Sequence, residues 1–224
     1  MIIDREKMAE YESLEEYCRL YKTMHGPGSY LWLGMFIIST DYEHSDLALG
    51  HRLIADSIGH AEIPLEDIYG RVLISGNAYD DIEKNEELGA RLLIDAAERG
   101  SAQSLYAAGL CLIAGIGVER DLERADRVKD AMLNSINAKT DAQEREIDLK
   151  IANNQYQELL KVSYSYQLDP GAIEQAIREY FHNEGARMHN NLVANGQSTH
   201  FFQPEIAAQY HFDEFGPYDP AVDL

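Results

Sequence analysis

Apolar residues recur at steps of three and four along most of this chain, which is the spacing of one face of an α-helix. The pattern is anchored on Gly34, Gly70 and Gly109, each followed at the third and fourth positions by aliphatic residues. A second set of small anchors follows 16 or 19 residues later, each with an arginine two positions on and an aliphatic residue three positions on. These second anchors are Gly50, Gly89 and Ala125. The pattern therefore predicts a pair of helices that is repeated three times.

The distances between anchors agree with a repeat that carries one insertion. Both links from a second anchor to the next glycine, Gly50 to Gly70 and Gly89 to Gly109, are 20 residues long. The middle pair has three additional residues, which we place in the acidic turn segment 78–87. Because glycine inside a helix costs ~1 kcal/mol relative to alanine, we expect the paired small residues to let two helix backbones approach closely.

The third copy resembles the Sel1-like repeats, relatives of the tetratricopeptide repeats, whose pattern is Leu-Gly-x-x-Tyr-x-x-Gly-x-Gly-Val-x-x-Asp-x-x-Lys-Ala. Leu112 replaces the tyrosine and Arg124 the lysine, and the first copy has Thr40 in place of a turn glycine. The resemblance covers residues 29–138 and implies an α-helical solenoid of about three helix hairpins that binds proteins. The matching residues of the third copy are Gly109, Gly115, Gly117, Val118, Asp121 and Ala125.

Three further segments complete the predicted all-α fold. Residues 1–28 have an amphipathic pattern and form an N-terminal capping helix. Residues 139–195 form C-terminal helices that close the other end of the array, the last beginning at Asp169-Pro170. Residues 196–224 form an extended aromatic tail, because the helical pattern stops there while six aromatic residues remain.

The acidic balance of the chain changes which partners are plausible. It has 39 acidic and 19 basic residues, a net charge of −20. This argues against binding of nucleic acid or of anionic membranes, both of which need clustered lysine and arginine. It suits another protein as partner, in particular a basic one. Our candidate contacts are acidic residues of the middle turn and of the tail: Asp80, Asp81, Glu83, Glu86, Glu87, Asp213 and Glu214.

The sequence offers no pattern for catalysis, a metal or a cofactor. It has no nucleophile elbow, phosphate-binding loop or zinc-protease motif, and its eight histidines do not form a ligand set. We expect Cys18 and Cys111 to be buried thiols in a reducing compartment. The start of the chain lacks a secretory signal and the longest apolar run, Leu31–Ile38, is too short to span a bilayer. We therefore expect a cytoplasmic protein, and a bacterial one.

The leading hypothesis is a protein-interaction module without catalytic activity. Its most specific version is a bacterial immunity protein that binds and neutralises a basic toxin or effector. An adaptor or regulatory scaffold of a signalling or secretion complex is the alternative. A third hypothesis makes the C-terminal third an enzyme around His182, Glu184 and His189. The sequence leaves the partner's identity and the oligomeric state open.

Overall fold

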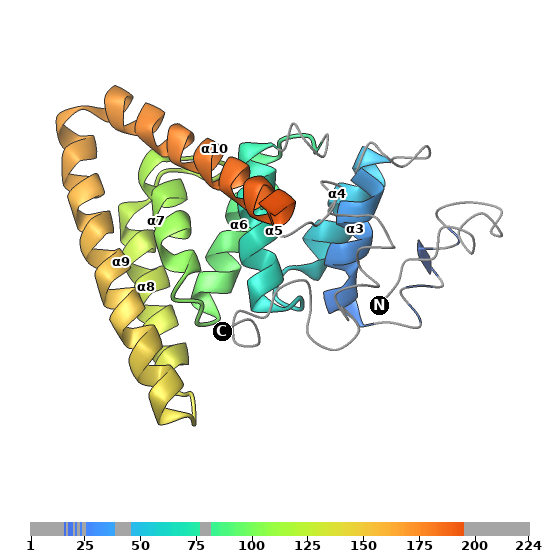
Figure 1. Cartoon of the computed structure of the whole chain (residues 1–224), viewed down its shortest axis with the longest axis horizontal. Coiled ribbons are helices and arrows are strands. Elements are labelled where there is room, and N and C mark those ends of the chain that lie inside the picture. Colours follow the sequence, from blue (N-terminus) through green and yellow to red (C-terminus); the bar gives the residue numbers. More distant parts are fainter. Residues whose placement is uncertain are drawn as a thin grey trace. The chain divides into compact units, whose positions relative to one another are not determined.

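All elements in the described part of the chain are helical. We analysed a computed structural model of the whole chain, which describes residues 16, 18, 19, 21, 23, 26–38, 46–76 and 82–194, with side chains at 36 and 185–194 excepted. The described part contains no strand, so the predicted all-α class is confirmed. The elements are η1 (Pro27–Ser29), α3 (Tyr30–Ile38), α4 (Leu47–Ser57), α5 (Ile63–Ser75), α6 (Glu86–Glu98), α7 (Ser104–Ala114), α8 (Leu122–Asn137), α9 (Ala142–Leu168) and α10 (Pro170–Ala194) (Figure 1).

The chain divides into two compact units. The first comprises Met1–Leu65, Asn77–Glu83 and Met188–Leu224, and the second comprises Glu66–Gly76 and Lys84–Arg187. No helix of the described residues is long and apolar enough to cross a membrane. The predicted tail, 196–224, lies outside the described residues, as do Asp80, Asp81, Asp213 and Glu214.

The first unit contains the hairpin of α3 and α4. A Cβ atom added to Gly34 would lie 2.7 Å from the carbonyl oxygen of Gly50, and one added to Gly50 would lie 2.9 Å from that of Gly34. The two backbones therefore touch where the paired anchors were predicted. In the segment 1–28 the described residues 16, 18, 19, 21 and 23 are helical. Of these, Cys18 and Tyr21 are buried.

The second unit repeats this contact in the hairpin of α5 and α6. A Cβ atom at Gly89 would lie 2.6 Å from the carbonyl oxygen of Gly70, and the reciprocal distance is 3.0 Å. The first distance is shorter than real Cβ atoms show and the second is at the tight limit, so alanine at Gly89 would force the helices apart. The repeated frame predicted these two contacts correctly.

The first helices of the second and third hairpins end in the same way. Gly76 and Gly115 both adopt the left-handed conformation, with φ of 64° and 73°. The amide of Gly76 donates to the carbonyl of Val72 at 3.0 Å, and that of Gly115 donates to Cys111 at 2.8 Å. Each glycine lies six residues after its anchor, Gly70 or Gly109. Glycine suits this position because a side chain is strained at positive φ.

The second helices share a start as well. The predicted cap Asp121 accepts a hydrogen bond from the amide of Arg124 at 2.8 Å. The residues at the same place in the first two hairpins, Asp46 and Asn85, cap α4 and α6 in the same manner. The amides of Asn85 and Asp121 also donate to matching carbonyls, those of Leu73 at 2.8 Å and Leu112 at 3.0 Å.

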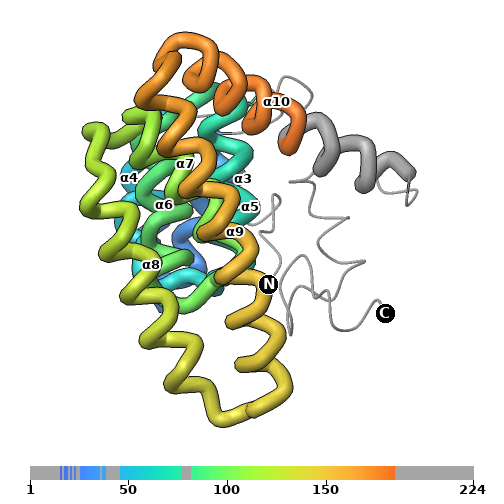
Figure 2. Tube along the Cα trace, turned by 90° about the vertical axis from the view of Figure 1, so that its left-hand side faces the viewer, coloured from blue at the N-terminus to red at the C-terminus, as the bar shows by residue number. Residues whose placement is uncertain are grey.

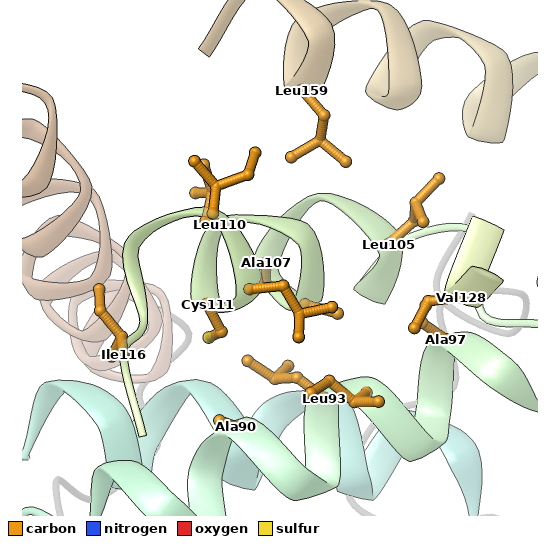
Figure 3. Packing of buried hydrophobic residues seen from close by; sticks show 14 of the residues in the cluster. Ala90, Leu93, Ala97, Leu105, Ala107, Leu110, Cys111, Ile116, Val128 and Leu159 are labelled. Carbon is orange, nitrogen blue, oxygen red and sulfur yellow. The ribbon is translucent and has the colours of Figure 1, made fainter. Parts of the chain in front are cut away.

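The third hairpin departs from the prediction at its anchor glycine. We expected Gly109 to touch Ala125, but a Cβ atom at Gly109 would lie 2.5 Å and 2.6 Å from the two Cδ atoms of Leu159 on α9. Figure 3 shows Leu159 reaching from α9 toward α7. The small residue at 109 therefore makes room for the next helix, because α9 packs against both α7 and α8.

The predicted C-terminal segment 139–195 contains the two helices α9 and α10. Asp169 accepts from the amide of Ala172 at 3.1 Å and starts α10, as expected. From there α10 turns back across the second unit (Figure 2), and its Tyr180 reaches Arg71 of α5. Ile177 and Phe181 belong to the same hydrophobic core as α6, α7 and α8. Residues 142–184 are therefore part of one unit with the second and third hairpins.

Candidate protein-binding surface

The acidic start of α6 contains the three predicted contact residues that the structure describes. Glu83 and Glu87 are exposed, whereas Glu86 is only partly so. A carboxylate oxygen of Glu86 lies 2.6 Å from Nζ of Lys84 and 2.7 Å from a guanidinium nitrogen of Arg178. Glu87 and Glu83 thus remain accessible to a partner, while Glu86 is engaged within the chain.

The titration of Glu86 agrees with this internal role. Burial alone would raise its pKa, but the hydrogen bonds from Lys84 and Arg178 outweigh burial and lower the pKa below its usual range. Glu86 therefore stays ionised and helps to hold α10 on the second unit. It is a weaker candidate for a partner contact than its sequence neighbourhood suggested.

The turn of the third hairpin lies directly against this acidic start. A Cβ atom at Gly117, whose φ is 68°, would overlap the carbonyl of Glu86 and lie 2.9 Å from the amide nitrogen of Glu87. Gly117 is followed after one residue by the exposed Glu119. We call Glu87 and Glu119, which both belong to the second unit, the acidic turn surface. Glu119 was not among the predicted contacts, because only the packing of Gly117 brings its turn to α6.

The basic residue Arg120, which directly follows Glu119, is exposed and makes two contacts within the second unit. Arg120 donates from Nε to the carbonyl of Ile113 at 3.0 Å, and its guanidinium carbon lies 4.6 Å from the ring centroid of Tyr166. The side chain is therefore directed to its own helix hairpin and to α9. Arg120 and Lys84 are both exposed, so basic side chains stand beside the carboxylates of the acidic turn surface.

A second cluster of polar residues lies where α10 crosses α5 and α7. Nε of Arg71 donates to both carboxylate oxygens of Asp67, at 3.2 Å and 3.1 Å. Its terminal nitrogens donate to the hydroxyl of Tyr180 at 2.6 Å and to the carbonyl of Gln103 at 3.1 Å. Glu184 stands 3.7 Å away. Arg71 is buried, so these contacts replace water around its charge.

The contacts of Arg71 hold three helices together. Burial would lower the pKa of Arg71, but the interactions with Asp67 and Tyr180 raise the pKa by more than burial lowers it. The guanidinium therefore stays charged. Asp67 also accepts a hydrogen bond from the Ser104 hydroxyl at 2.9 Å. Hydrogen bonds of the cluster thus join α5, α7 and α10. The sequence analysis did not predict this cluster.

The structure describes the side chains of two of the three residues named in the enzyme hypothesis. His182 is exposed, while Glu184 is directed toward Arg71, and the side chain of His189 lies outside the described part. No group of three or more histidine, cysteine or acidic residues within the described ranges could hold a metal ion. Cys18 and Cys111 are buried free thiols, and burial raises the pKa of Cys111 well above its ordinary value.

Comparison of the chain with protein families, with characterised proteins and with solved structures found no significant match.

Proposed function

We propose that this chain is a protein-binding module built from Sel1-like helix hairpins. The observation that carries the proposal is the frame shared by the hairpins. Paired glycines touch at 34/50 and at 70/89, and the second helices begin with equivalent side-chain caps at 46, 85 and 121. Hairpins of this kind present extended surfaces, and their functions are those of surfaces that bind other proteins.

The narrower proposal is a bacterial immunity protein that acts in the cytoplasm. It is supported by the net charge of −20 and by the exposed carboxylates of the acidic turn surface. An acidic inhibitor is steered rapidly onto a basic enzyme, since opposite fields accelerate encounter. Speed matters to a cell that must neutralise a toxin before it acts.

The test is co-expression of the full chain with the product of the neighbouring gene. We expect that product to arrest growth alone, and to be harmless and co-purify with this chain when both are present. If the product is harmless alone and does not bind, the immunity function is wrong. If it binds without being toxic, the adaptor alternative is correct.

A further inference from the structure

The helix α10 contacts the rest of the second unit along one of its faces. The contact residues are Ile177, Tyr180, Phe181 and Glu184, of which the last three follow the first at three, four and seven positions. They therefore share one side of the helix. Ile177 and Phe181 are buried in the core, whereas Tyr180 and Glu184 lie against Arg71. This is the spacing by which an amphipathic helix binds to another protein. We call these four residues the α10 anchors.

The surface that receives the anchors lies on α5 and α7, the first helices of the second and third hairpins. Where α10 crosses the unit (Figure 2), Arg71 of α5 donates to the hydroxyl of Tyr180 at 2.6 Å. The ring of Tyr106 on α7 lies edge-on to that of Tyr180, with 5.5 Å between the centroids. Asp67 binds Arg71 from one turn earlier on α5. We call Asp67, Arg71 and Tyr106 the α5–α7 face.

The polar part of this face does not depend on α10 for its charge balance. Arg71 lies 3.0 Å from a carboxylate oxygen of Asp67 and donates to the carbonyl of Gln103 at 3.1 Å. The contacts that α10 adds to Arg71 are those with Tyr180 and Glu184. Water can replace both, because hydrogen bonds to water and hydrogen bonds within a protein differ little in free energy. The α5–α7 face is therefore suited to exposure.

The attachment of α10 has few buried side chains. Among residues 170–184 only Ile177 and Phe181 are buried, whereas nine of the eleven residues of α7 are buried. The preceding helix α9 packs against both α7 and α8. Elements with few buried apolar contacts open locally while the rest of a domain stays folded. We therefore expect α10 to separate from the α5–α7 face before the hairpins unfold.

We propose that the α5–α7 face is a binding site for an amphipathic helix, and that α10 occupies it as an internal ligand until the helix of a partner protein displaces α10. The partner's helix has the chemistry of the α10 anchors: two apolar side chains one turn apart, with a hydroxyl and a carboxylate that face Arg71. The inference rests on the proposed protein-binding function and adds a second contact surface to it. Because α10 is tethered, it competes at an effective concentration in the millimolar range, so weak ligands are excluded.

Hydrogen exchange of the unchanged full chain tests the separation of α10. We expect the amides of residues 173–184 to exchange at least about tenfold faster than those of α7, because α10 opens without the hairpins. Equal exchange rates in the two helices overturn the inference, since α10 then separates only when the whole unit unfolds.

Binding of a fluorescent peptide of residues 169–187 tests the site itself. The peptide includes the helix cap Asp169 and all four anchors. It should bind to full-length Phe181→Ala at least about tenfold more tightly than to the wild-type chain, because the variant's own α10 is a weaker competitor. A peptide with Tyr180→Ala and Phe181→Ala is the control ligand and should bind to neither protein.

Equal affinity of the peptide for the two proteins overturns the inference, as does equal binding of the control peptide. The exchange rates of the wild-type chain decide the question even if Phe181→Ala does not fold. Both experiments use this chain alone, so their failure leaves the co-expression test of the proposed function unaffected.

Discussion

Single glycines decide how closely the helices of a hairpin approach. Glycine at positions 70 and 89 destabilises each helix by about 1 kcal/mol relative to alanine. The missing side chains allow the two helix backbones to come into contact. Gly109 uses the same freedom differently, because its missing side chain is replaced by Leu159 of α9. The same residue type therefore contacts a helix backbone at Gly70 and Gly89, and a leucine side chain at Gly109.

Replacing Gly89 by alanine should therefore destabilise the protein. The added methyl group would lie 2.6 Å from the backbone oxygen of Gly70, and the overpacking costs about 1–3 kcal/mol in unfolding free energy despite the better helix propensity. Urea denaturation measures the loss. The matched control is Gly171→Ala in α10, where the nearest atom is 3.8 Å away; it should be neutral or slightly stabilising. An equal response of the two variants would contradict the backbone contact.

Arg71 allows a second test at the residue level. Arg71→Met should lower the unfolding free energy by about 3–5 kcal/mol, because Asp67, whose side chain is only 14% exposed, loses the partner of its charge. The double variant Arg71→Met/Asp67→Leu should recover most of that loss. The comparison again uses urea denaturation. If the double variant is as unstable as the single one, the ion pair is not the source of the loss.

Helix ends explain which elements the sequence predicts well. The cap at Asp121 and the turn glycines at 76 and 115 act on atoms within a few residues, so a local pattern reveals them. The caps at Asp46 and Asn85 carried the same signal, four residues before Gly50 and Gly89, and the frame could have identified them. Contacts between residues fewer than twenty positions apart can therefore be predicted from a local sequence pattern.

The course of α10 could not be predicted, although its start at Asp169-Pro170 was. Its direction depends on Arg71 and Tyr180, which are 109 positions apart and meet only in the folded chain. The same holds for the contact of Gly117 with Glu86, which brings Glu119 to the acidic turn surface. Such long-range contacts leave no period in the sequence.

Asp121 gives a test at the level of the helix. Its hydrogen bond from the amide of Arg124 lowers its pKa, so the stability that its charge adds is present above the unfolded pKa of ~3.9 and is lost as the pH falls through the lower, folded value. Asp121→Ala should lower the melting temperature by about 2–4 °C at neutral pH. Asp121→Asn should keep the cap and lose only this acid dependence. Identical melting curves for all three proteins from pH 3 to 7 would contradict the capping role.

At the scale of the whole molecule, charge governs encounter with other molecules. The double variant Glu87→Lys/Glu119→Lys should slow association with a basic partner about tenfold at low salt, with a smaller effect at high salt. The control Glu146→Lys/Glu179→Lys changes the net charge equally at exposed sites elsewhere and should slow association less. Stopped-flow kinetics at two salt concentrations separates the two. If both variants slow association equally, the net charge alone sets the association rate and the acidic turn surface has no specific role.

The proposed function depends most on one claim: a partner protein binds across the turns of the second and third hairpins. Hydrogen exchange of the full chain, with and without the product of the neighbouring gene, tests it most directly. We expect amide exchange to slow at residues 84–87 and 116–120 together when the partner is added. Unchanged exchange throughout both turns in the presence of a saturating amount of that product would contradict the claim.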